Sequence, residues 1–292
     1  MDEIFSKMPA DLLPFGETII ALNLLFLLFV FLELGYDYFS GNQRRVFSQA
    51  FVDLGTYLGH ELAWKIGGSF VFLGTLLFVE KFRAFDIPMN AMSWGLGLLL
   101  ADFLYYWSHR LEHRSRLFWS WHNVHHSSQD YHGTTALRLS WIEPYVSWYL
   151  LVPLVLIGFK PYQVFLFFQI LLTYQTWIHT QKIGNLGVLE HILNTPSNHR
   201  VHHGSNPEYI DKNFGAVLIV WDKIFRTYAA ESTPVKYGLQ RNIGTNNPIR
   251  VNLREPGLLL EGLLKNRGVK HKLKWIFWSS AWSPEEKVVS KR

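Results

Sequence analysis

Five stretches of the chain are apolar and long enough to suggest membrane spans. They cover residues 18–34, 66–79 (extended back through Ala63), 89–107, 141–159 and 162–178. A helix needs about 20 apolar residues to cross a bilayer, and Trp and Tyr near the ends of such stretches are typical of the membrane interface. The pattern therefore predicts a mainly α-helical, integral membrane bundle of four to five helices, in preference to a soluble protein with apolar core helices.

The last two stretches predict a hairpin in the membrane. They are separated by Gly158-Phe159-Lys160-Pro161, a sequence that ends one helix and starts another. A hairpin enters and returns on the same face. The residues that follow Trp107 and those that follow Ile178 are therefore expected to meet on one side of the membrane.

Basic residues indicate which side this is. Lys and Arg favour cytoplasmic segments. They therefore place the ends of the first and third spans and the C-terminal region in the cytoplasm, through Arg44, Arg45, Arg110, Arg114, Arg116, Lys265, Arg267, Lys270, Lys272 and Lys274. Lys81 and Arg83 oppose this orientation. The chain is expected to be a multi-pass protein of a bacterial inner membrane or of the endoplasmic reticulum.

These patterns divide the chain into five segments. We expect N-terminal spans over 1–107, two His motifs over 108–140, the membrane hairpin over 141–180, a third His motif and cytoplasmic cap over 181–244, and a basic amphipathic tail over 245–292. The tail contains two amphipathic stretches, 255–266 and 269–282. They predict a helix at the membrane interface or a solvated basic helix.

Composition narrows the chemistry. The chain has 292 residues, 49% of them hydrophobic and only 17% charged, and it has no cysteine. The absence of Cys excludes disulfides, Cys-ligated zinc, iron–sulfur clusters and cysteine nucleophiles. The net charge of +5 comes with no nucleic-acid-binding motif, so no nucleic-acid partner is expected.

Histidines carry the strongest signal. Eight of the 13 lie in three closely spaced motifs, namely His109 and His113, then His122, His125 and His126, then His199, His202 and His203. On a helix, spacings of three and four residues place imidazoles on one face. Neutral imidazole is a usual ligand for zinc, iron, copper or nickel. Eight such ligands exceed the needs of one ion and favour two metals close together.

The pattern separates several kinds of metal site. A structural zinc normally uses Cys or stops at four ligands, and a zinc hydrolase normally shows His-Glu-x-x-His, which is absent. A metal carrier is the alternative from a different class, but it would place polar ligands inside the spans, where only His60 and Asp102 are candidates. Paired redox-active iron at the membrane surface is the interpretation that uses all eight histidines.

These motifs resemble the fatty acid hydroxylase / sterol desaturase superfamily of integral membrane di-iron enzymes. The resemblance extends over residues 102–238 and is greatest to the alkylglycerol monooxygenase-like branch, through HHSS at 125–128, TTALR at 134–138, WIHT at 177–180, LEHILNTPS at 189–197, HRVHHG at 199–204, YIDKN at 209–213 and VWDKIF at 220–225. The resemblance implies an O₂-dependent oxidoreductase that hydroxylates a lipid C–H bond, with cleavage of alkyl ether lipids as one outcome. Desaturation by the same centre is the alternative.

The resemblance also assigns residues. It implies that two iron ions are held by the eight histidines already named and by His179 as a ninth ligand; as a residue at a helix end, His179 could equally cap carbonyl groups. Electrons would come from an external donor protein or a soluble reductant. Gln129 and Arg114 depart from the branch; they are expected to leave the metal centre unchanged, and they leave the lipid and a pterin requirement open.

The remaining polar candidates have weaker assignments. His132 is open between ligand, supporting residue and surface residue, and His60 is expected to pack within the bundle. His191 is expected to support a ligand or to pack, and His271 to belong to the solvated tail. Asp102 lies seven residues before His109, where it would orient a ligand, cap a helix or pair with an Arg.

Overall fold

The computed structural model describes residues 13–40, 43–266 and 268–278, and its regular elements there are helices. Two isolated bridges, Leu193–Leu218 and Gly204–Tyr237, provide the strand-like pairing in this part of the chain. The helices in chain order are α2 (Leu13–Phe39), α3 (Gln43–Ala63), η2 (Trp64–Gly68), α4 (Ser69–Glu80), α5 (Ala91–Arg114), α6 (Arg116–His126), η3 (Gly133–Leu137), α7 (Glu143–Val146), η4 (Tyr149–Leu151), α8 (Val152–Ile157), α9 (Pro161–Trp177), η5 (Gly187–His191), α10 (Pro196–His202), α11 (Val220–Ile224), α12 (Pro248–Lys265) and α13 (Val269–Phe277). The predicted mainly α-helical class is confirmed.

Among the described residues, two helices are long and apolar enough to cross a membrane, Gly16–Phe39 and Phe47–Glu80. The second joins α3, the π-helical turn η2 and α4 into one continuous helix. The sequence analysis placed the start of this stretch near residue 63, whereas the candidate helix begins at Phe47. Exposed apolar side chains extend it toward the N-terminus at helical spacing, at Phe47, Phe51, Leu54, Leu58 and Leu62. Polar residues on the buried face of the same helix lower the average hydropathy and conceal this apolar face.

The other three predicted spans are helical to different degrees. Helices α5 and α9 form largely where expected, whereas the stretch 141–159 is divided into α7, η4 and α8. Pro144 and Pro153 each stand in the first turn of one of these short helices, because proline fits a helix start and interrupts a helix interior. None of these three segments is both long and apolar enough to count as a candidate membrane span. The number of four to five spans stays a prediction.

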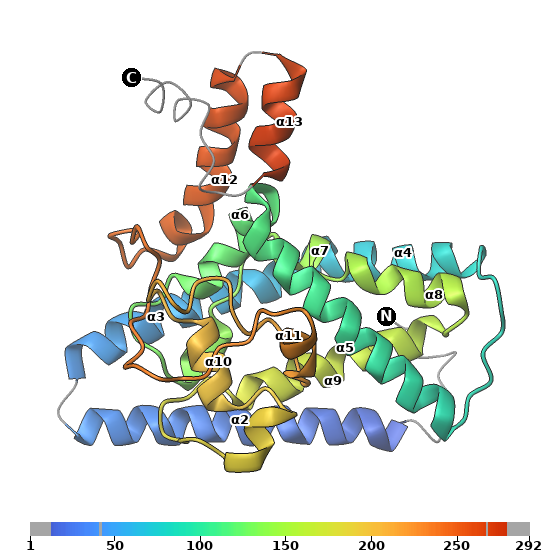
Figure 1. The fold of residues 1–292 in the computed structure, drawn as a ribbon, viewed down its shortest axis with the longest axis horizontal. Helices are drawn as coiled ribbons and strands as arrows, with labels where there is room; N and C mark the ends of the chain where they lie inside the picture. The colour runs from blue at the N-terminus through green and yellow to red at the C-terminus, as the bar shows by residue number, and fades with distance from the viewer. Residues whose placement is uncertain (1–12, 41–42, 267, 279–292) are drawn as a thin grey trace.

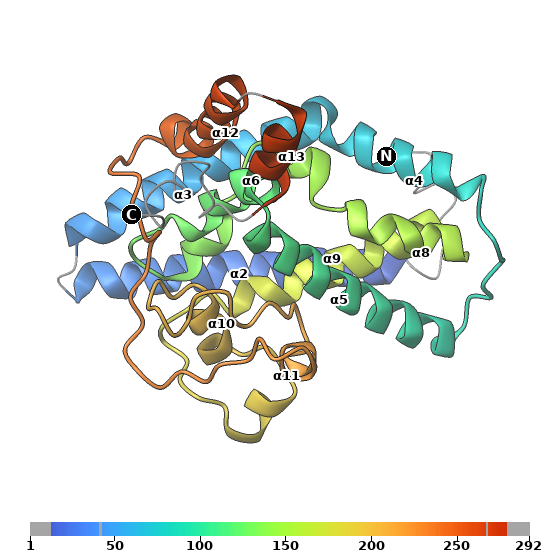
Figure 2. The same cartoon turned by 45° about the horizontal axis from the view of Figure 1, so that its top comes forward.

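The long helices share one general direction. Helix α2 and the α3–α4 helix run lengthwise in both views, α9 packs against α2 and α4, and α5 packs on α9 at an oblique angle (Figures 1 and 2). An aromatic core that includes Phe72, Leu154, Phe159 and Phe167 joins α4, α5, α8 and α9. The irregular segments around α10 and α11 lie at the other end, beside α2 and α9 (Figure 1). The polar chemistry is therefore gathered at one end of an apolar bundle.

Helices α12 and α13 form a hairpin that projects from this body (Figure 1). It contacts α6, and α12 also contacts α3. The predicted amphipathic stretches fall on these two helices. Of the second stretch, residues 279–282 lie outside the described residues.

Candidate metal centre

Three helices carry the histidine motifs. His109 and His113 lie one turn apart on α5, α6 carries His122, His125 and His126, and α10 carries His199 and His202, with His203 at its C-cap. His179 follows the end of α9. Thr195 caps α10 by accepting a hydrogen bond from the Asn198 amide, and Pro196 opens its first turn. The predicted helical placement of the three motifs is confirmed.

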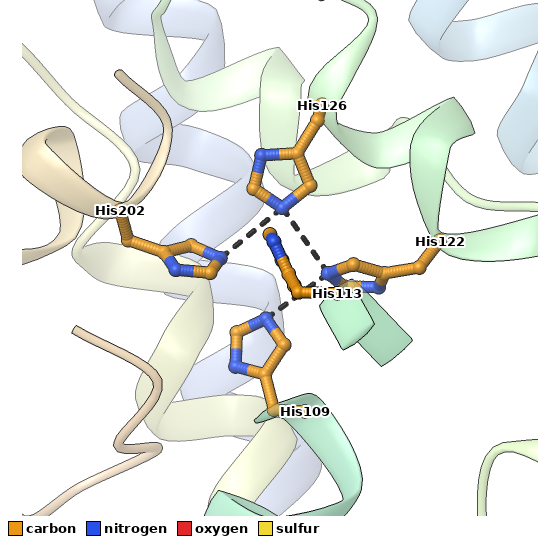
Figure 3. Close-up of side chains that lie close together, drawn as sticks. All are labelled: His109, His113, His122, His126 and His202. Atoms are coloured by element: carbon orange, nitrogen blue, oxygen red, sulfur yellow. Dashed lines mark hydrogen bonds between the residues drawn. The ribbon is translucent and has the colours of Figure 1, made fainter. Parts of the chain in front are cut away.

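The folded chain brings all nine predicted ligands into two groups. Within each group the candidate ligand atoms lie within 4.8 Å of one another. Group A consists of His109, His113, His122, His126 and His202, and group B consists of His125, His179, His199 and His203. Figure 3 shows the side chains of group A converging from three separate chain segments. Helices α6 and α10 each supply histidines to both groups, so the two groups share a support.

The inward-facing nitrogens are very close. In group A, the Nε2 atoms are separated by 3.0 Å between His109 and His122, by 3.1 Å between His122 and His126, and by 3.1 Å between His126 and His202 (Figure 3). In group B the separations are 3.1 Å for His125–His179, 3.0 Å for His179–His199 and 3.2 Å for His199–His203.

Two of these nitrogens in group B cannot be bonded to each other. The Nδ1 of His125 lies 3.3 Å from the Arg138 carbonyl oxygen, and the Nδ1 of His179 lies 2.7 Å from the Gln175 carbonyl oxygen. A carbonyl only accepts, so a neutral imidazole must carry its proton on this Nδ1. Both Nε2 atoms are then lone pairs 3.1 Å apart. Two lone pairs this close repel each other, so the arrangement fits a cation bound by both nitrogens.

Group A repeats the arrangement. The Nδ1 of His109 donates to the Phe214 carbonyl at 2.9 Å, and the Nδ1 of His202 donates to the Lys212 carbonyl at 3.0 Å. Their Nε2 atoms are therefore lone pairs directed into the group. The buried Nε2 of His113 has no hydrogen-bond partner. Buried polar atoms are normally paired, so the donor set of group A also fits a bound metal ion.

Burial keeps these ligands neutral. It lowers the pKa of His109 to about 3 and the pKa of His125 to about 4. Burial likewise lowers the pKa of His122, His126 and His202 well below the usual value, and the neighbouring imidazoles add to the effect. Metal binding requires neutral imidazole, and these side chains therefore provide it without first releasing protons near neutral pH.

A loop on the far side of the site holds two of the accepting carbonyls. Asn213 has a left-handed backbone, with φ of 56°, and its side-chain amide donates to the Asn198 and Ala229 carbonyls. The Asp222 carboxylate accepts from the Phe214 and Gly215 amides, both at 2.8 Å. These bonds hold the Phe214 carbonyl in place, and this carbonyl accepts the hydrogen bond from the His109 Nδ1.

Asp102 acts on the same loop. Its carboxylate accepts from the Val217 amide at 2.8 Å, the Leu218 amide at 3.2 Å and the Trp221 indole at 2.8 Å. The expected role in orienting a ligand is therefore indirect, and in the described part of the chain its hydrogen bonds go to this loop and not to a helix cap or an Arg. Sequence analysis could not identify these partners, because they lie more than 100 positions away from Asp102 in the chain. Asp102 supports His109 only through the backbone of this loop.

Two carboxylates beside group A were missed by the sequence analysis. The Glu112 carboxylate lies 3.3 Å from the His122 Nδ1. Asp211 lies 3.8 Å from the His113 Nδ1 and 3.3 Å from the Arg114 Nε. Arg114, which is expected to leave the metal centre unchanged, forms an ion pair with this carboxylate beside His113. The position of Glu112 inside the first His motif was the available signal.

A buried ionic network supports group B. The Arg138 guanidinium donates to Asp53 at 2.8 Å, to Gln49 at 2.9 Å and to Ser127 at 2.9 Å. Arg138 and Asp53 have side-chain exposures of 2% and 0%. The Arg138 carbonyl is the acceptor for His125, so a carboxylate on the α3–α4 helix is connected to a group B ligand. Sequence analysis did not identify this pair.

The other histidines lie outside both groups. His132 is buried and lies 2.6 Å from the Thr134 hydroxyl, so it is not a surface residue. His60 is half-buried on α3 and lies 3.8 Å from Glu61, as expected for a packed polar residue. His191 is exposed and lies 3.2 Å from the Lys223 amine, which contradicts a role beside the ligands. His271 is exposed on α13, as predicted for the tail.

Comparisons with known proteins identify a domain over the site. The fatty acid hydroxylase family model matches residues 94–227, which include all nine histidines of groups A and B. Alkylglycerol monooxygenase of Homo sapiens is 45% identical over 207 residues, covering 70% of this chain and 46% of that protein. Alkylglycerol monooxygenase of Caenorhabditis elegans is 35% identical over 238 residues, covering 76% of this chain and 46% of that protein.

A bacterial relative is also similar. Ornithine lipid hydroxylase OlsE of Rhizobium tropici is 30% identical over 178 residues, covering 58% of this chain and 53% of that protein. The chain thus spans about half the length of the curated relatives it matches. No solved structure shows a significant match to it.

Proposed function

Because the chain belongs to the fatty acid hydroxylase superfamily, in its alkylglycerol monooxygenase-like branch, we propose that it is a membrane-bound, O₂-dependent lipid hydroxylase. The observation that carries this proposal is the pair of histidine groups, in which the buried Nε2 lone pairs of His125 and His179 face each other at 3.1 Å and the buried Nε2 of His113 has no hydrogen-bond partner. The named relatives are monooxygenases and a lipid hydroxylase. Both observations point to metal-assisted oxidation of a lipid.

We assign one iron ion to each group. Group A would hold its ion with His109, His113, His122, His126 and His202, and group B with His125, His179, His199 and His203. Bound iron supplies O₂ activation and the oxidation of an unreactive C–H bond. All the assigned ligands are imidazoles, and the chain has no cysteine, so its sulfur is limited to four methionines. Iron is one of the metals that bind imidazole well.

The protein's own share is ligand orientation and exclusion of water. The carbonyls of Arg138, Lys212 and Phe214 fix the tautomer of one histidine each, which raises the basicity of the inward nitrogen. Most of the nine side chains are buried. A dry site protects a reactive oxidant from side reactions with solvent.

The substrate class follows from the branch and from the apolar surroundings. We propose an alkyl ether lipid that reaches the site from the bilayer. Hydroxylation consumes one O₂, two electrons and two protons, puts one oxygen atom into the C–H bond and releases the other as water. If that carbon adjoins the ether oxygen, the resulting hemiacetal breaks its C–O bond to give an aldehyde and a free hydroxyl. The electrons come from an external protein or small reductant; a pterin is one candidate.

The membrane topology is part of the same proposal. The two helices Gly16–Phe39 and Phe47–Glu80 are candidate spans, and α5 and the α7–α9 segment would complete a multi-pass bundle. The histidine groups, from the segments 108–140 and 181–244 and from His179 at the end of the hairpin, would then lie on the cytoplasmic side, as the basic residues around α6 and α13 favour.

Lipid mass spectrometry under ¹⁸O₂ tests the chemistry. Cells that express the chain are compared with cells that express His202→Ala, which removes a group A ligand, and with the matched control His191→Ala, an exposed histidine outside both groups. We expect a lipid product with one heavy oxygen in the parent and in the control. His202→Ala should lose this product, and the purified variant should lose about one bound iron ion.

The outcomes separate the alternatives. Aldehyde released from an ether lipid selects the alkylglycerol reaction, and a stable labelled alcohol selects another lipid hydroxylation. Loss of two hydrogens without a heavy oxygen would identify a desaturase. Metal uptake into vesicles without O₂ consumption would instead identify a carrier and overturn the proposal.

A further inference from the structure

The α12–α13 hairpin leaves apolar side chains uncovered on α12. Ile249, Leu253, Leu260 and Leu264 are exposed, and Leu264 reaches 77%. Their spacings of four, seven and four residues place them in one narrow stripe along the helix. The opposite part of the helix packs through buried Val251, so this stripe is additional to the packed face.

Helix α13 has the same character. Val269, Leu273 and Phe277 recur every four residues, and all three are exposed, Val269 to 73%. Lys270 and Lys274 stand one position after Val269 and Leu273, which places cationic side chains along the edge of the apolar stripe. Apolar residues flanked by lysines are typical of helices that lie in a membrane interface.

The orientation of the hairpin supports this comparison. It projects across the direction of α2 and of the α3–α4 helix, and Figures 1 and 2 agree on this. Those two helices contain the candidate spans. If they cross the bilayer, an element that runs across them lies parallel to the membrane surface.

We propose that the α12–α13 hairpin binds an anionic membrane surface, with its apolar stripes in the acyl boundary and its lysines on lipid phosphates. Charge selects this occupant, because α13 carries Lys270, Lys272 and Lys274 and has no acidic residue. The basic tail was open between an interfacial and a solvated helix on sequence alone. The exposed stripes and the orientation favour the interfacial form. The proposal goes beyond lipid oxidation and requires no bound metal.

The hairpin is joined rigidly to the metal-bearing helix. The Trp275 ring packs so closely on Gly262 that a Cβ at Gly262 would lie 1.9 Å from it. The centroid of the same ring lies 3.3 Å from the Arg116 guanidinium carbon, and the Arg116 amide donates to the Trp278 carbonyl at 2.9 Å. Arg116 begins α6, which supplies ligands to both groups. A membrane-bound hairpin would therefore fix the depth of the histidine groups relative to the lipid.

Single spin labels test the proposal on the full chain. The sequence contains no cysteine, so Leu264→Cys and Leu273→Cys each place one label on a stripe, and Glu261→Cys is the matched control on the charged side of α12. The chains are reconstituted in nanodiscs of phosphatidylcholine with and without phosphatidylglycerol. Collision with O₂, which dissolves in lipid, is compared with collision with a water-soluble nickel chelate.

We expect the two stripe labels to be open to O₂ and shielded from nickel, most strongly with phosphatidylglycerol, and the Glu261 label to show the reverse. Lys270→Gln, Lys272→Gln and Lys274→Gln should weaken this shielding by about fivefold for each charge removed. Stripe labels as open to nickel as the Glu261 label would overturn the proposal. Shielding that persists in lipid-free detergent and depends on protein concentration would assign the surface to a second copy instead. Neither result depends on enzymatic activity, so both are independent of the proposed oxidation.

Discussion

Four histidines of the two groups use their two nitrogens for different tasks. His109, His125, His179 and His202 each present Nδ1 to a backbone carbonyl. The backbone acceptors fix the proton on one side of the ring, so the lone pair is fixed on the other side. Groups A and B are therefore preorganised by the chain itself, and the residues that hold the acceptors are as important for the site as the ligands.

Glu112 is the clearest side-chain case. Its carboxylate lies 3.3 Å from the His122 Nδ1 and accepts from the Trp121 indole at 3.4 Å. Removing the acceptor with Glu112→Leu should weaken iron binding in group A by about 10- to 100-fold, because an unsupported imidazole loses orientation and basicity. Glu112→Gln, whose amide oxygen still accepts, should retain most of the affinity.

Iron titration with a chelator competition measures this difference. Group B contains no contact with Glu112 among the described interactions, so its ion should bind with unchanged affinity and serves as the internal control. Equal loss in the Leu and Gln variants would show that Glu112 matters for packing and not for the His122 proton.

At the scale of elements, the two candidate spans each supply one buried carboxylate to the polar end. Glu33 on α2 accepts from the Gly133 amide at 2.6 Å and the Thr180 hydroxyl at 2.8 Å. Asp53 on α3 accepts from Arg138 and from the Thr134 hydroxyl at 2.7 Å. Charged residues within membrane segments are costly and usually functional. Here they tie the segment 133–138 and the residue after His179 to the spans.

The Asp53–Arg138 pair makes a testable prediction. Asp53→Leu leaves the Arg138 charge buried without its carboxylate, and breaking such a pair typically costs about 3–5 kcal/mol. We expect a lower thermal unfolding midpoint and a loss of iron from group B, whose ligand His125 bonds to the Arg138 carbonyl. Adding Arg138→Met removes the unpaired charge and should recover most of the stability. A double variant no more stable than Asp53→Leu alone would contradict the ion-pair explanation.

The extent of prediction from sequence differs between elements for a physical reason. The His motifs on α5, α6 and α10 depend on local helical spacing, which the sequence shows directly. The start of the second span was missed because Asp53 and Gln49 are buried on one face while Phe47 and Phe51 are exposed on the other. The loop that supports His109 depends on Asp102 and Asp222, whose partners are fixed only by the fold.

At the scale of the whole molecule, the two groups concentrate nine neutral imidazoles at one end of the bundle. Without metal, this concentration makes the folded state sensitive to acid. A histidine in the unfolded chain has a pKa near 6.5, whereas burial lowers the pKa of His109 to about 3 and that of His125 to about 4 in the folded chain. Between these values the unfolded chain binds more protons than the folded chain.

Stability of the metal-free protein should therefore fall as pH decreases below about 6.5, by about 1.4 kcal/mol per pH unit for each such histidine. The loss continues until the pH reaches the folded-state pKa values, since only there does the folded chain take up the same protons. Thermal unfolding in detergent between pH 7.5 and about 5, with and without iron, measures the effect. Iron should raise the midpoint most near neutral pH, where protons compete least with the metal. A midpoint of the metal-free chain that stays constant across this range would show that the histidines are solvated and protonate freely in the folded state, contrary to the buried arrangement of groups A and B.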